Sequence, residues 1–499
     1  MGIVQRDSIR IMVISYLGAA IGYLNKILLF TNFLTAEQVG LSNIIISIAA
    51  VYAQFSGLGM TGVTIKFFPY FKDKEKHHHG FLFWTSLLSL FGFLLLTIIF
   101  LLFKSPIINY YSEKSPLLVE YSFYVIPLAL ATVYYNLLEV FLRSLMKTVV
   151  FSLVNEIVLR LMISASILLF AFKLVSFHEF VIIYVGVNCS ATLILLVYMA
   201  YLKQLLFKPE WSSTTKRFFK IVLHYGSFAI VGNMSYILMN NIDALMVAAM
   251  IGLKDTGVYT TVFFIATVML IPYRSLARVA SPLVAQFWKN REMKKMHDLY
   301  KKVTLMSLIT GCFIFLGLWV NIDNIFHFIP DEYASGKYVF LFLGIGRLFD
   351  MATGINGIIL VTSKKYRYDL LFTILLIGVM IALNLAFIPT YGIEGASFAT
   401  MLSIITLNTL RIIYIWSVFG MQPFDFKSVW VILIGVFTLG VIYFIPPILN
   451  VYADMIIRSL ICLVLYAAPV LWLKLSEEVN ENAIKILKAA HLYPPEGRK

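Results

Sequence analysis

The segment Phe81–Phe103 reads FLFWTSLLSLFGFLLLTIIFLLF and contains no charged residue. A helix of this length spans about 35 Å, which is enough to cross the hydrocarbon core of a bilayer. No water is available in that core to solvate an open backbone, so only a helix or a closed barrel satisfies the peptide groups there. The segment therefore predicts a transmembrane helix.

Similar apolar runs occur along the whole chain. Hydrophobic residues make up 60% of the 499 residues, charged residues only 13%, and the mean hydropathy is +0.86. This composition excludes an ordinary soluble protein, and the long uninterrupted runs exclude an outer-membrane barrel. We expect an all-α polytopic membrane protein with about 14 transmembrane helices, at residues 9–31, 41–68, 80–103, 117–142, 149–172, 178–202, 221–249, 256–283, 303–326, 337–361, 370–388, 393–416, 428–449 and 455–473.

The basic residues indicate how these spans are oriented. Loops on the N-terminal side, together with both tails, hold 27 of the 40 Lys and Arg residues, whereas the opposite loops hold five. Positively charged loops stay on the cytoplasmic side, so both termini are predicted to be cytoplasmic. The net charge of +14 is then mainly a signal of topology, and a nucleic-acid partner is not expected.

An internal repeat is suggested by sliding the chain on itself by 217 residues. This offset places Gly40 on Gly257 and superimposes the edges of the first six spans on those of the next six. Repeats with an even number of spans share one orientation, which predicts two six-helix lobes related by a pseudo-twofold axis along the membrane normal. The alternative is a coincidence of regular span spacing. The predicted division is 1–208 and 209–420 for the lobes, 421–475 for two additional transmembrane helices, and 476–499 for a cytoplasmic tail.

Three short motifs resemble a known family: LTAEQVG at 34–40, followed by Gly57-Leu58-Gly59; IGLKDTGVY at 251–259; and PTYGIEGA at 389–396. Together they resemble the polysaccharide biosynthesis, O-antigen-type flippase branch of the multidrug/oligosaccharidyl-lipid/polysaccharide (MOP) exporter superfamily, over residues 5–475. The multidrug exporters (MATE) of that superfamily share the third pattern.

The resemblance implies a MATE-like fold and a central, often cationic cavity. It also implies alternating access that moves an undecaprenyl-diphosphate-linked oligosaccharide from the inner to the outer leaflet of a bacterial inner membrane. The product would be a cell-surface polysaccharide such as O-antigen of lipopolysaccharide, capsule or exopolysaccharide. A polysaccharide polymerase and glycosyltransferases are candidate partners.

Arginines inside the spans are the candidate substrate-binding residues. Arg274 and Arg278 share one face of span 256–283, without an acidic residue nearby on that helix, and Pro272 should kink the span. Bidentate guanidinium groups suit a diphosphate. The alternative is that both side chains reach the cytoplasmic loop.

Arg160 and Arg347 are the two further candidates for a cationic cleft. Each has an acid on its own helix that offers a local ion pair instead, Glu156 four residues before the first and Asp350 three residues after the second.

Lys26 and Asp243 are candidate gate or ion-coupling residues. They are equivalent under the 217-residue offset, so a pseudo-twofold axis would bring them face to face near the outer side. Opposite charges there could close the outer side and separate when it opens. The alternative is that each finds a partner in its own lobe.

Two other functions are the alternatives. An ion-coupled multidrug exporter would favour acids in the cleft, whereas bases outnumber acids inside these spans. An integral-membrane polymerase or glycosyltransferase usually has a large outer loop with acids or histidines, and the predicted outer loops are short. No catalytic residue, metal site or cofactor is expected, and the run His77-His78-His79 is interpreted as solvated.

Overall fold

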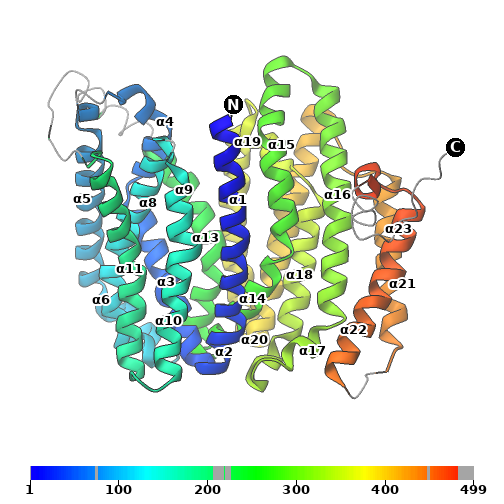
Figure 1. Cartoon of the computed structure of the whole chain (residues 1–499), viewed down its shortest axis with the longest axis horizontal. Helices are drawn as coiled ribbons and strands as arrows, with labels where there is room; N and C mark the ends of the chain where they lie inside the picture. Colours follow the sequence, from blue (N-terminus) through cyan, green and yellow to red (C-terminus); the bar gives the residue numbers. More distant parts are fainter. Residues whose placement is uncertain are drawn as a thin grey trace. The chain divides into compact units, whose positions relative to one another are not determined.

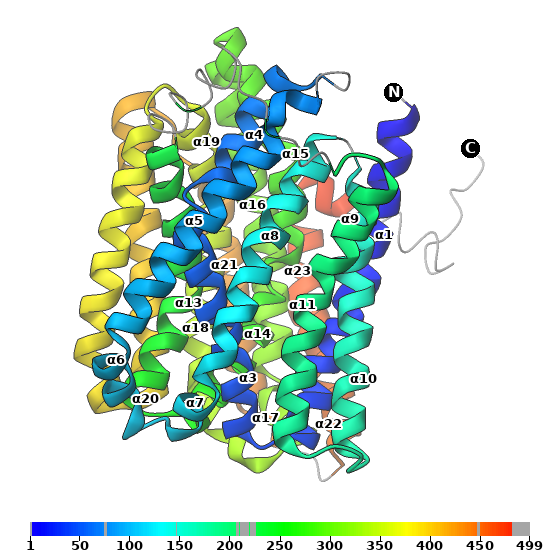
Figure 2. The same cartoon turned by 90° about the vertical axis from the view of Figure 1, so that its left-hand side faces the viewer.

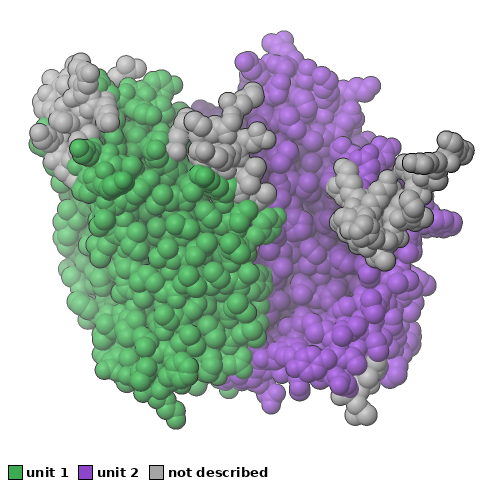
Figure 3. Space-filling view, viewed as in Figure 1, with its two compact units in different colours: residues 1–261 green, residues 262–499 purple. Residues whose placement is uncertain are grey.

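The computed structural model describes residues 2–73, 77–145, 147–205, 209, 219, 226–446 and 450–481. Within this part of the chain the regular elements are all helices. The all-α class predicted from the apolar runs is therefore confirmed. Contacts divide the chain into two compact units, unit 1 at residues 1–261 and unit 2 at residues 262–499 (Figure 3).

Unit 1 opens with a long span that changes its helical type midway. Helix α1 (Gly2–Tyr23) continues through the π-helical η1 (Leu24–Leu29) into α2 (Phe30–Phe33). A capping box then starts α3 (Ala36–Ser56), because the Thr35 hydroxyl accepts a hydrogen bond from the Gln38 backbone N–H and the Gln38 side chain accepts one from Thr35 in return.

The predicted span 41–68 is not one helix. The chain breaks between α3 and α4 (Met60–Phe71), where Leu58 and Gly59 have φ angles of 46° and 70°. A Cβ atom at Gly59 would collide with the carbonyl oxygen of Gly226, so the break also permits a close approach of two backbones. Hydropathy alone did not reveal this break, because apolar residues continue through it.

The remaining helices of unit 1 pack around α3 and α8. Figure 2 shows α5, α8, α10 and α11 running alongside one another. Their bounds are η2 (His77–Gly80), α5 (Phe81–Leu102), α6 (Lys104–Ser112), α7 (Pro116–Tyr121), η3 (Ser122–Tyr124), α8 (Val125–Ser144), α9 (Thr148–Leu153), η4 (Val154–Val158), α10 (Leu159–Ala171), α11 (Phe177–Tyr201), α13 (Ser227–Met250) and the first part of α14 (Leu253–Thr267).

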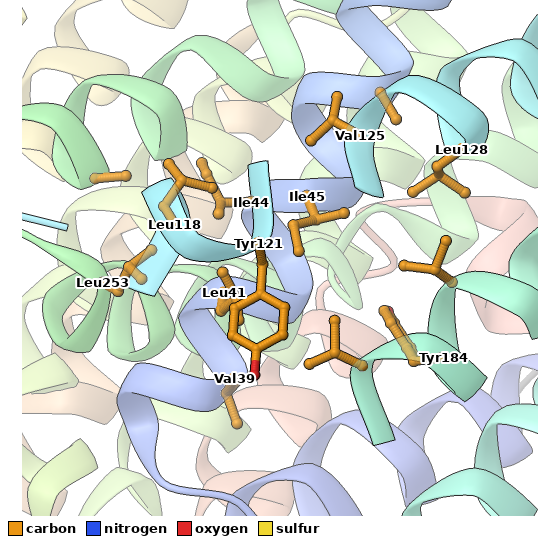
Figure 4. Packing of buried hydrophobic residues seen from close by; sticks show 14 of the residues in the cluster. Val39, Leu41, Ile44, Ile45, Leu118, Tyr121, Val125, Leu128, Tyr184 and Leu253 are labelled. Atoms are coloured by element: carbon orange, nitrogen blue, oxygen red, sulfur yellow. The ribbon is translucent and has the colours of Figure 1, made fainter. Parts of the chain in front are cut away.

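A buried cluster around the start of α3 holds one end of unit 1 together. The side chain of Tyr121 lies close to Val39 and Leu41 of α3, with Tyr184 of α11 on the same side (Figure 4). Leu253 at the start of α14 belongs to the same cluster. Lipid tails are as apolar as these side chains, so close packing rather than expulsion of water favours this contact.

Unit 2 begins within α14 and contains the last helices of the chain. Figure 1 shows them from α15 (green) to α23 (red). Their bounds are α15 (Leu270–Asn290), α16 (Met293–Trp319), α17 (Ile322–Phe326), η6 (Asp331–Gly336), α18 (Lys337–Ala352), α19 (Asn356–Thr362), α20 (Tyr366–Phe419), α21 (Phe426–Tyr443), α22 (Val451–Cys462), η7 (Leu463–Ala467) and α23 (Ala468–Trp472).

Helix α20 contains two spans rather than one. Its 54 residues would extend about 80 Å, far more than a bilayer core. Gly392 interrupts it with φ 56° and ψ −135°, a backbone conformation that suits glycine, shortly after Pro389. The two limbs match the predicted spans 370–388 and 393–416.

Length and hydropathy identify fewer spans in the described residues than the predicted fourteen. Within the described ranges, ten helices are long and apolar enough to cross a membrane, or twelve when each of two bent pairs counts as one span. The second limb of α20 and the apolar stretch 237–250 of α13, which has only 14 residues, are the candidates for the other two. One bent pair is α14 with α15, at 51°. Pro272 lies in the first turn of α15, where the missing N–H costs nothing, so the predicted kink comes just before it.

The contact units do not follow the predicted lobe boundary at 208/209. Helix α13 packs against α3, and unit 1 therefore extends to Thr261. The assignment of lobes from the repeat stays a prediction. Residues 206–208 and 210–218 around that boundary lie outside the described part of the chain, as do residues 482–499 of the predicted tail.

Candidate functional site

The starts of α3 and α14 cross at two glycines within unit 1. A Cβ atom at Gly40 would collide with the carbonyl oxygen of Leu253, and one at Gly257 would collide with the carbonyl oxygen of Ala36. The same hypothetical atoms would lie 3.0 Å from Gly257 N and 3.1 Å from Gly40 N. The absence of both side chains is what allows the two backbones to touch.

These contacts are reciprocal under the predicted repeat. Gly40 and Gly257 are 217 residues apart, and so are Ala36 and Leu253. A twofold axis between two helices produces such contacts in pairs. Each contact is repeated on the other side of the axis with the equivalent residues exchanged. The crossing therefore supports the offset found in the sequence.

Lys26 lies beside this crossing and binds a polar side chain. Its ammonium group donates to Asn43 Oδ1 on α3, and Asn43 Nδ2 donates in turn to Thr260 Oγ1 on α14 at 2.9 Å. The ammonium group also lies 4.9 Å from the centre of the Phe30 ring. A charged amine inside a span is thus held by an amide and an aromatic face.

Asp243 is buried and has a different partner. Its side chain is 4% exposed, and Oδ2 accepts a hydrogen bond of 3.0 Å from the hydroxyl of Tyr259 on α14. The two residues predicted to oppose one another are therefore each bonded to neighbours of the α3–α14 crossing. Their direct pairing stays a prediction, and the sequence did not single out Asn43, Tyr259 or Thr260 as those neighbours.

Arg274 and Arg278 are exposed on the same face of α15. Within the described residues, neither guanidinium group has a hydrogen bond or an ion pair. The opposite face of the helix, with Ala280 and Val284, is buried. Two unpaired cations one turn apart can bind the oxygen atoms of one anion.

Arg160 has the local partner that its helix offers. The guanidinium group donates to Glu156 Oε2 at 2.6 Å and to the carbonyl oxygen of Gly18 on α1. A Cβ atom at Gly18 would lie 2.6 Å from Glu156 Cβ, and one at Gly22 would collide with the Arg160 guanidinium group. The spacing Gly-x-x-x-Gly on α1 thus makes room for this ion pair, whose role in binding substrate stays a prediction.

Arg347 is nearly buried in α18, at 7% exposure. Its guanidinium carbon lies 5.0 Å from the centre of the Phe263 ring. Asp350, the acid three residues later, accepts a hydrogen bond of 2.9 Å from Asn408 Nδ2. A role for Arg347 in binding substrate stays a prediction as well.

A buried ion pair in unit 2 was missed by the sequence analysis. Arg411 on the second limb of α20 donates to Asp369 on the first limb at 2.8 Å, and both side chains are mostly buried. Next to it, Asn408 binds both Asp350 and Asn356. The sequence did contain a signal for this pair. The two opposite charges lie at similar distances from the break at Gly392, one before it and one after it, so a hairpin of two helices brings them to the same level.

Two family models and several solved structures match this chain. The family model described as "Polysaccharide biosynthesis protein" matches residues 4–288, and the MatE model matches residues 229–388. Among solved structures, the lipid II flippase MurJ in an inward closed conformation has a TM-score of 0.73 at 16% identity, covering 95% of this chain and 100% of that chain. An inward-facing multidrug resistance MATE transporter has a TM-score of 0.61 at 14% identity, covering 82% and 94%.

Two curated relatives match about half of this chain. An uncharacterized membrane protein, MJ1068 of Methanocaldococcus jannaschii, is 24% identical over 56% of this chain and 57% of its own length. A probable low-salt glycan biosynthesis flippase, Agl15 of Haloferax volcanii, is 20% identical over 47% and 49%. The chain thus spans about half the length of the curated relatives that it matches. Since the first family model covers more than half of the sequence, this chain belongs to the polysaccharide biosynthesis protein family of the MOP exporter superfamily.

Proposed function

We propose that this protein is a flippase that moves a lipid-linked oligosaccharide from the inner to the outer leaflet of the cell membrane. The single observation that carries the proposal is the pair Arg274 and Arg278, exposed and unpaired within the described residues on one face of α15. Membership of a polysaccharide biosynthesis family and the likeness to a probable glycan flippase support it.

The arginine pair suits a diphosphate linker between lipid and sugar. A charge at the centre of a bilayer costs about 2.5–3.5 kcal/mol on insertion scales, so an anionic headgroup needs cations along its path. Two guanidinium groups one turn apart offer several N–H donors in a planar, bidentate arrangement. Arg160 and Arg347 would assist once their present contacts open. The finer proposal is an undecaprenyl-diphosphate carrier in a bacterial inner membrane, with both termini cytoplasmic.

The membrane potential would favour this direction of movement. Each negative charge that moves outward across an inside-negative membrane gains about 2.3 kcal/mol per 100 mV. The sugar would cross along the polar face of α15 while the lipid tail stays in the bilayer. A resident cofactor is not needed for this movement, and no bond in the substrate is broken.

A reconstituted system tests the proposal directly. The full-length protein is placed in vesicles that contain a fluorescent, diphosphate-linked polyprenyl oligosaccharide, and an added reagent destroys the label in the outer leaflet only. Protein-dependent loss of the inner label at a rate above that of empty vesicles supports the proposal. Equal rates in both vesicle preparations would refute it.

An ion-coupled multidrug exporter is the second candidate, favoured by the match of the MatE model to residues 229–388. Such a transporter would use an acid in the membrane, and Asp243 is buried near the α3–α14 crossing. Efflux of a cationic dye from the same vesicles, driven by a sodium or proton gradient, would identify this function instead.

A further inference from the structure

A cavity of about 720 Å³ lies in unit 2, where α16 ends and where α18 and α22 begin. Figure 1 shows α17 and α22 side by side at this end of the unit. The charge-based topology predicts that this end faces outward. The cavity walls combine charged, amide, aromatic and aliphatic side chains, among them Asp323, Asn324, Lys337, Asp454 and Arg458.

One side of the cavity is a buried network of hydrogen bonds. Asp454 is 3% exposed and binds Arg458 Nε and Asn324 Nδ2, each at 2.7 Å. Arg458 also donates to the carbonyl oxygen of Ile445 at 3.0 Å, just after α21 ends. This network joins α17 to α22, and it pairs the one cation that the described residues place in the network, Arg458, with a carboxylate.

The cavity is also lined by a second, more open ion pair. Lys337 Nζ lies 2.8 Å from the Asp323 carboxylate, whose side chain is 75% exposed. Lys337 also lies 6.0 Å from the centre of the Trp319 ring. The charged groups that line the cavity are thus two cations and two carboxylates, and each cation is bonded to a carboxylate.

Aromatic rings complete the wall. Tyr338 at the start of α18 is 52% exposed, and Tyr443 at the end of α21 is 85% exposed. Aliphatic residues of α21, Val436 and Leu439, continue from Tyr443 along the helix. A ligand here would meet flat rings and exposed carboxylate oxygens at one end and an apolar wall at the other.

We propose that this cavity binds the sugar headgroup of a membrane glycolipid, with the lipid chain along α21. The proposal goes beyond the function proposed above, since the lipid that it places outside the arginine face of α15 carries a neutral sugar and no phosphate linker. Hydroxyl groups of a sugar donate to the remaining lone pairs of the Asp323 carboxylate, whose two oxygens also contact Lys337 Nζ, and the apolar face of the ring stacks on Tyr443 or Tyr338.

The charge balance favours a neutral sugar over a phosphate headgroup. A phosphate that approached Lys337 or Arg458 would also approach Asp323 or Asp454, and this like-charge repulsion cancels most of the attraction. The aromatic rings by themselves also fit an interfacial belt of Tyr and Trp, which anchors a protein at the level of the lipid headgroups. A belt predicts no difference between headgroups, so the comparison of two lipids separates these readings.

The experiment uses the full-length protein in nanodiscs that contain monoglucosyl diacylglycerol or phosphatidylglycerol with the same acyl chains. Native mass spectrometry measures the occupancy of each lipid on the protein. We expect preferential retention of the glucosyl lipid, and about fivefold weaker retention by Tyr443→Leu, which loses one stacking face. Tyr452→Leu is the matched control, because Tyr452 is 67% exposed on α22 but does not line the cavity.

A second variant gives a signature that lost folding would not produce. Asp323→Asn frees Lys337, so retention of the glucosyl lipid should fall while retention of phosphatidylglycerol rises about threefold. Equal retention of both lipids by the unmodified protein, or unchanged glucosyl-lipid retention in both variants, would overturn the site. Transport is followed in parallel: lost retention with intact flipping removes this site alone, and intact retention without flipping removes the proposed function alone.

Discussion

Asn43 and Thr260 form a hydrogen bond of 2.9 Å although they are 217 residues apart, which is the offset of the internal repeat. Residues that are equivalent in a repeat contact one another only close to the symmetry axis. The pseudo-twofold axis of the predicted repeat would therefore pass between α3 and α14 at the level of this bond, one turn from the crossing of Gly40 and Gly257. Lys26 joins the same chain of hydrogen bonds through Asn43.

The glycine crossing should not tolerate a methyl group. In Gly40→Ala or Gly257→Ala the new Cβ would collide with a backbone carbonyl oxygen, so α3 and α14 must move apart, at a cost of about 1–3 kcal/mol. Thermal unfolding of the purified protein measures this loss. Gly186→Ala on α11 is the control, since nothing lies within 4 Å of its hypothetical Cβ and the higher helix propensity of alanine should leave stability equal or higher. Equal stability of all three variants would contradict the close approach.

The exposed arginines of α15 should be needed for transport but not for folding. The double variant Arg274→Ala, Arg278→Ala should lower flipping at least tenfold in the vesicle assay, because each charge-assisted hydrogen bond contributes about 1.5–3 kcal/mol. Arg274→Lys keeps the charge without the planar fork and should fall between the unmodified protein and Arg274→Ala. Lys289→Ala, on the last turn of the same helix, is the matched control. Full transport by the double variant at normal expression would refute the assignment.

The buried pair Arg411 and Asp369 should stabilise unit 2 only as a pair. Arg411→Met leaves a buried carboxylate without its partner, which should cost about 3–5 kcal/mol in unfolding free energy. The double variant Asp369→Leu, Arg411→Met removes both charges and should regain most of that loss. Lys295→Met serves as the exposed control, because its pair with Glu292 is worth less than about 1 kcal/mol. A double variant as unstable as the single one would show that the two charges do not interact.

Charge reversal tests the proposed gate. Lys26→Asp and Asp243→Lys should each impair transport, and the double reversal should restore part of it if the two residues approach one another during the cycle. In the double reversal, Asn43 faces a carboxylate instead of an ammonium group, and Tyr259 faces an ammonium group instead of a carboxylate. Both partners can hydrogen-bond to either charge, so transport should recover in part. A double variant no better than the worse single variant would show that the gate does not depend on this pair.

Labelling from outside tests the topology. A cysteine at Ser112, which is exposed at the end of α6, should react with a membrane-impermeant thiol reagent added to intact cells. A cysteine at Thr214, in a predicted cytoplasmic loop that lies outside the described residues, should react only after the cells are opened. The reverse pattern would invert the predicted orientation.

Hydropathy was sufficient for the class and for most span positions, because the cost of an exposed peptide group in lipid leaves the chain few alternatives. It missed the break at Leu58 and Gly59, since backbone conformation does not change the apolar character of the run. The repeat offset suggested Asp243 as the partner of Lys26, which stays a prediction, but it did not single out the uncharged amide of Asn43, which Lys26 binds in the structure. Periodicity and charge identify where polar groups are costly, but not which neutral side chain lies close enough to bind them.

The ion pair between the limbs of α20 has a consequence for how this protein enters the membrane. Alone, Asp369 or Arg411 would raise the cost of inserting its own limb by up to about 2.5–3.5 kcal/mol, depending on its depth. Joined across the break at Gly392, the two charges neutralise one another within a hairpin. The two limbs should therefore leave the insertion machinery together as one helical hairpin, and biogenesis of this region would be arrested by any change that delays the second limb.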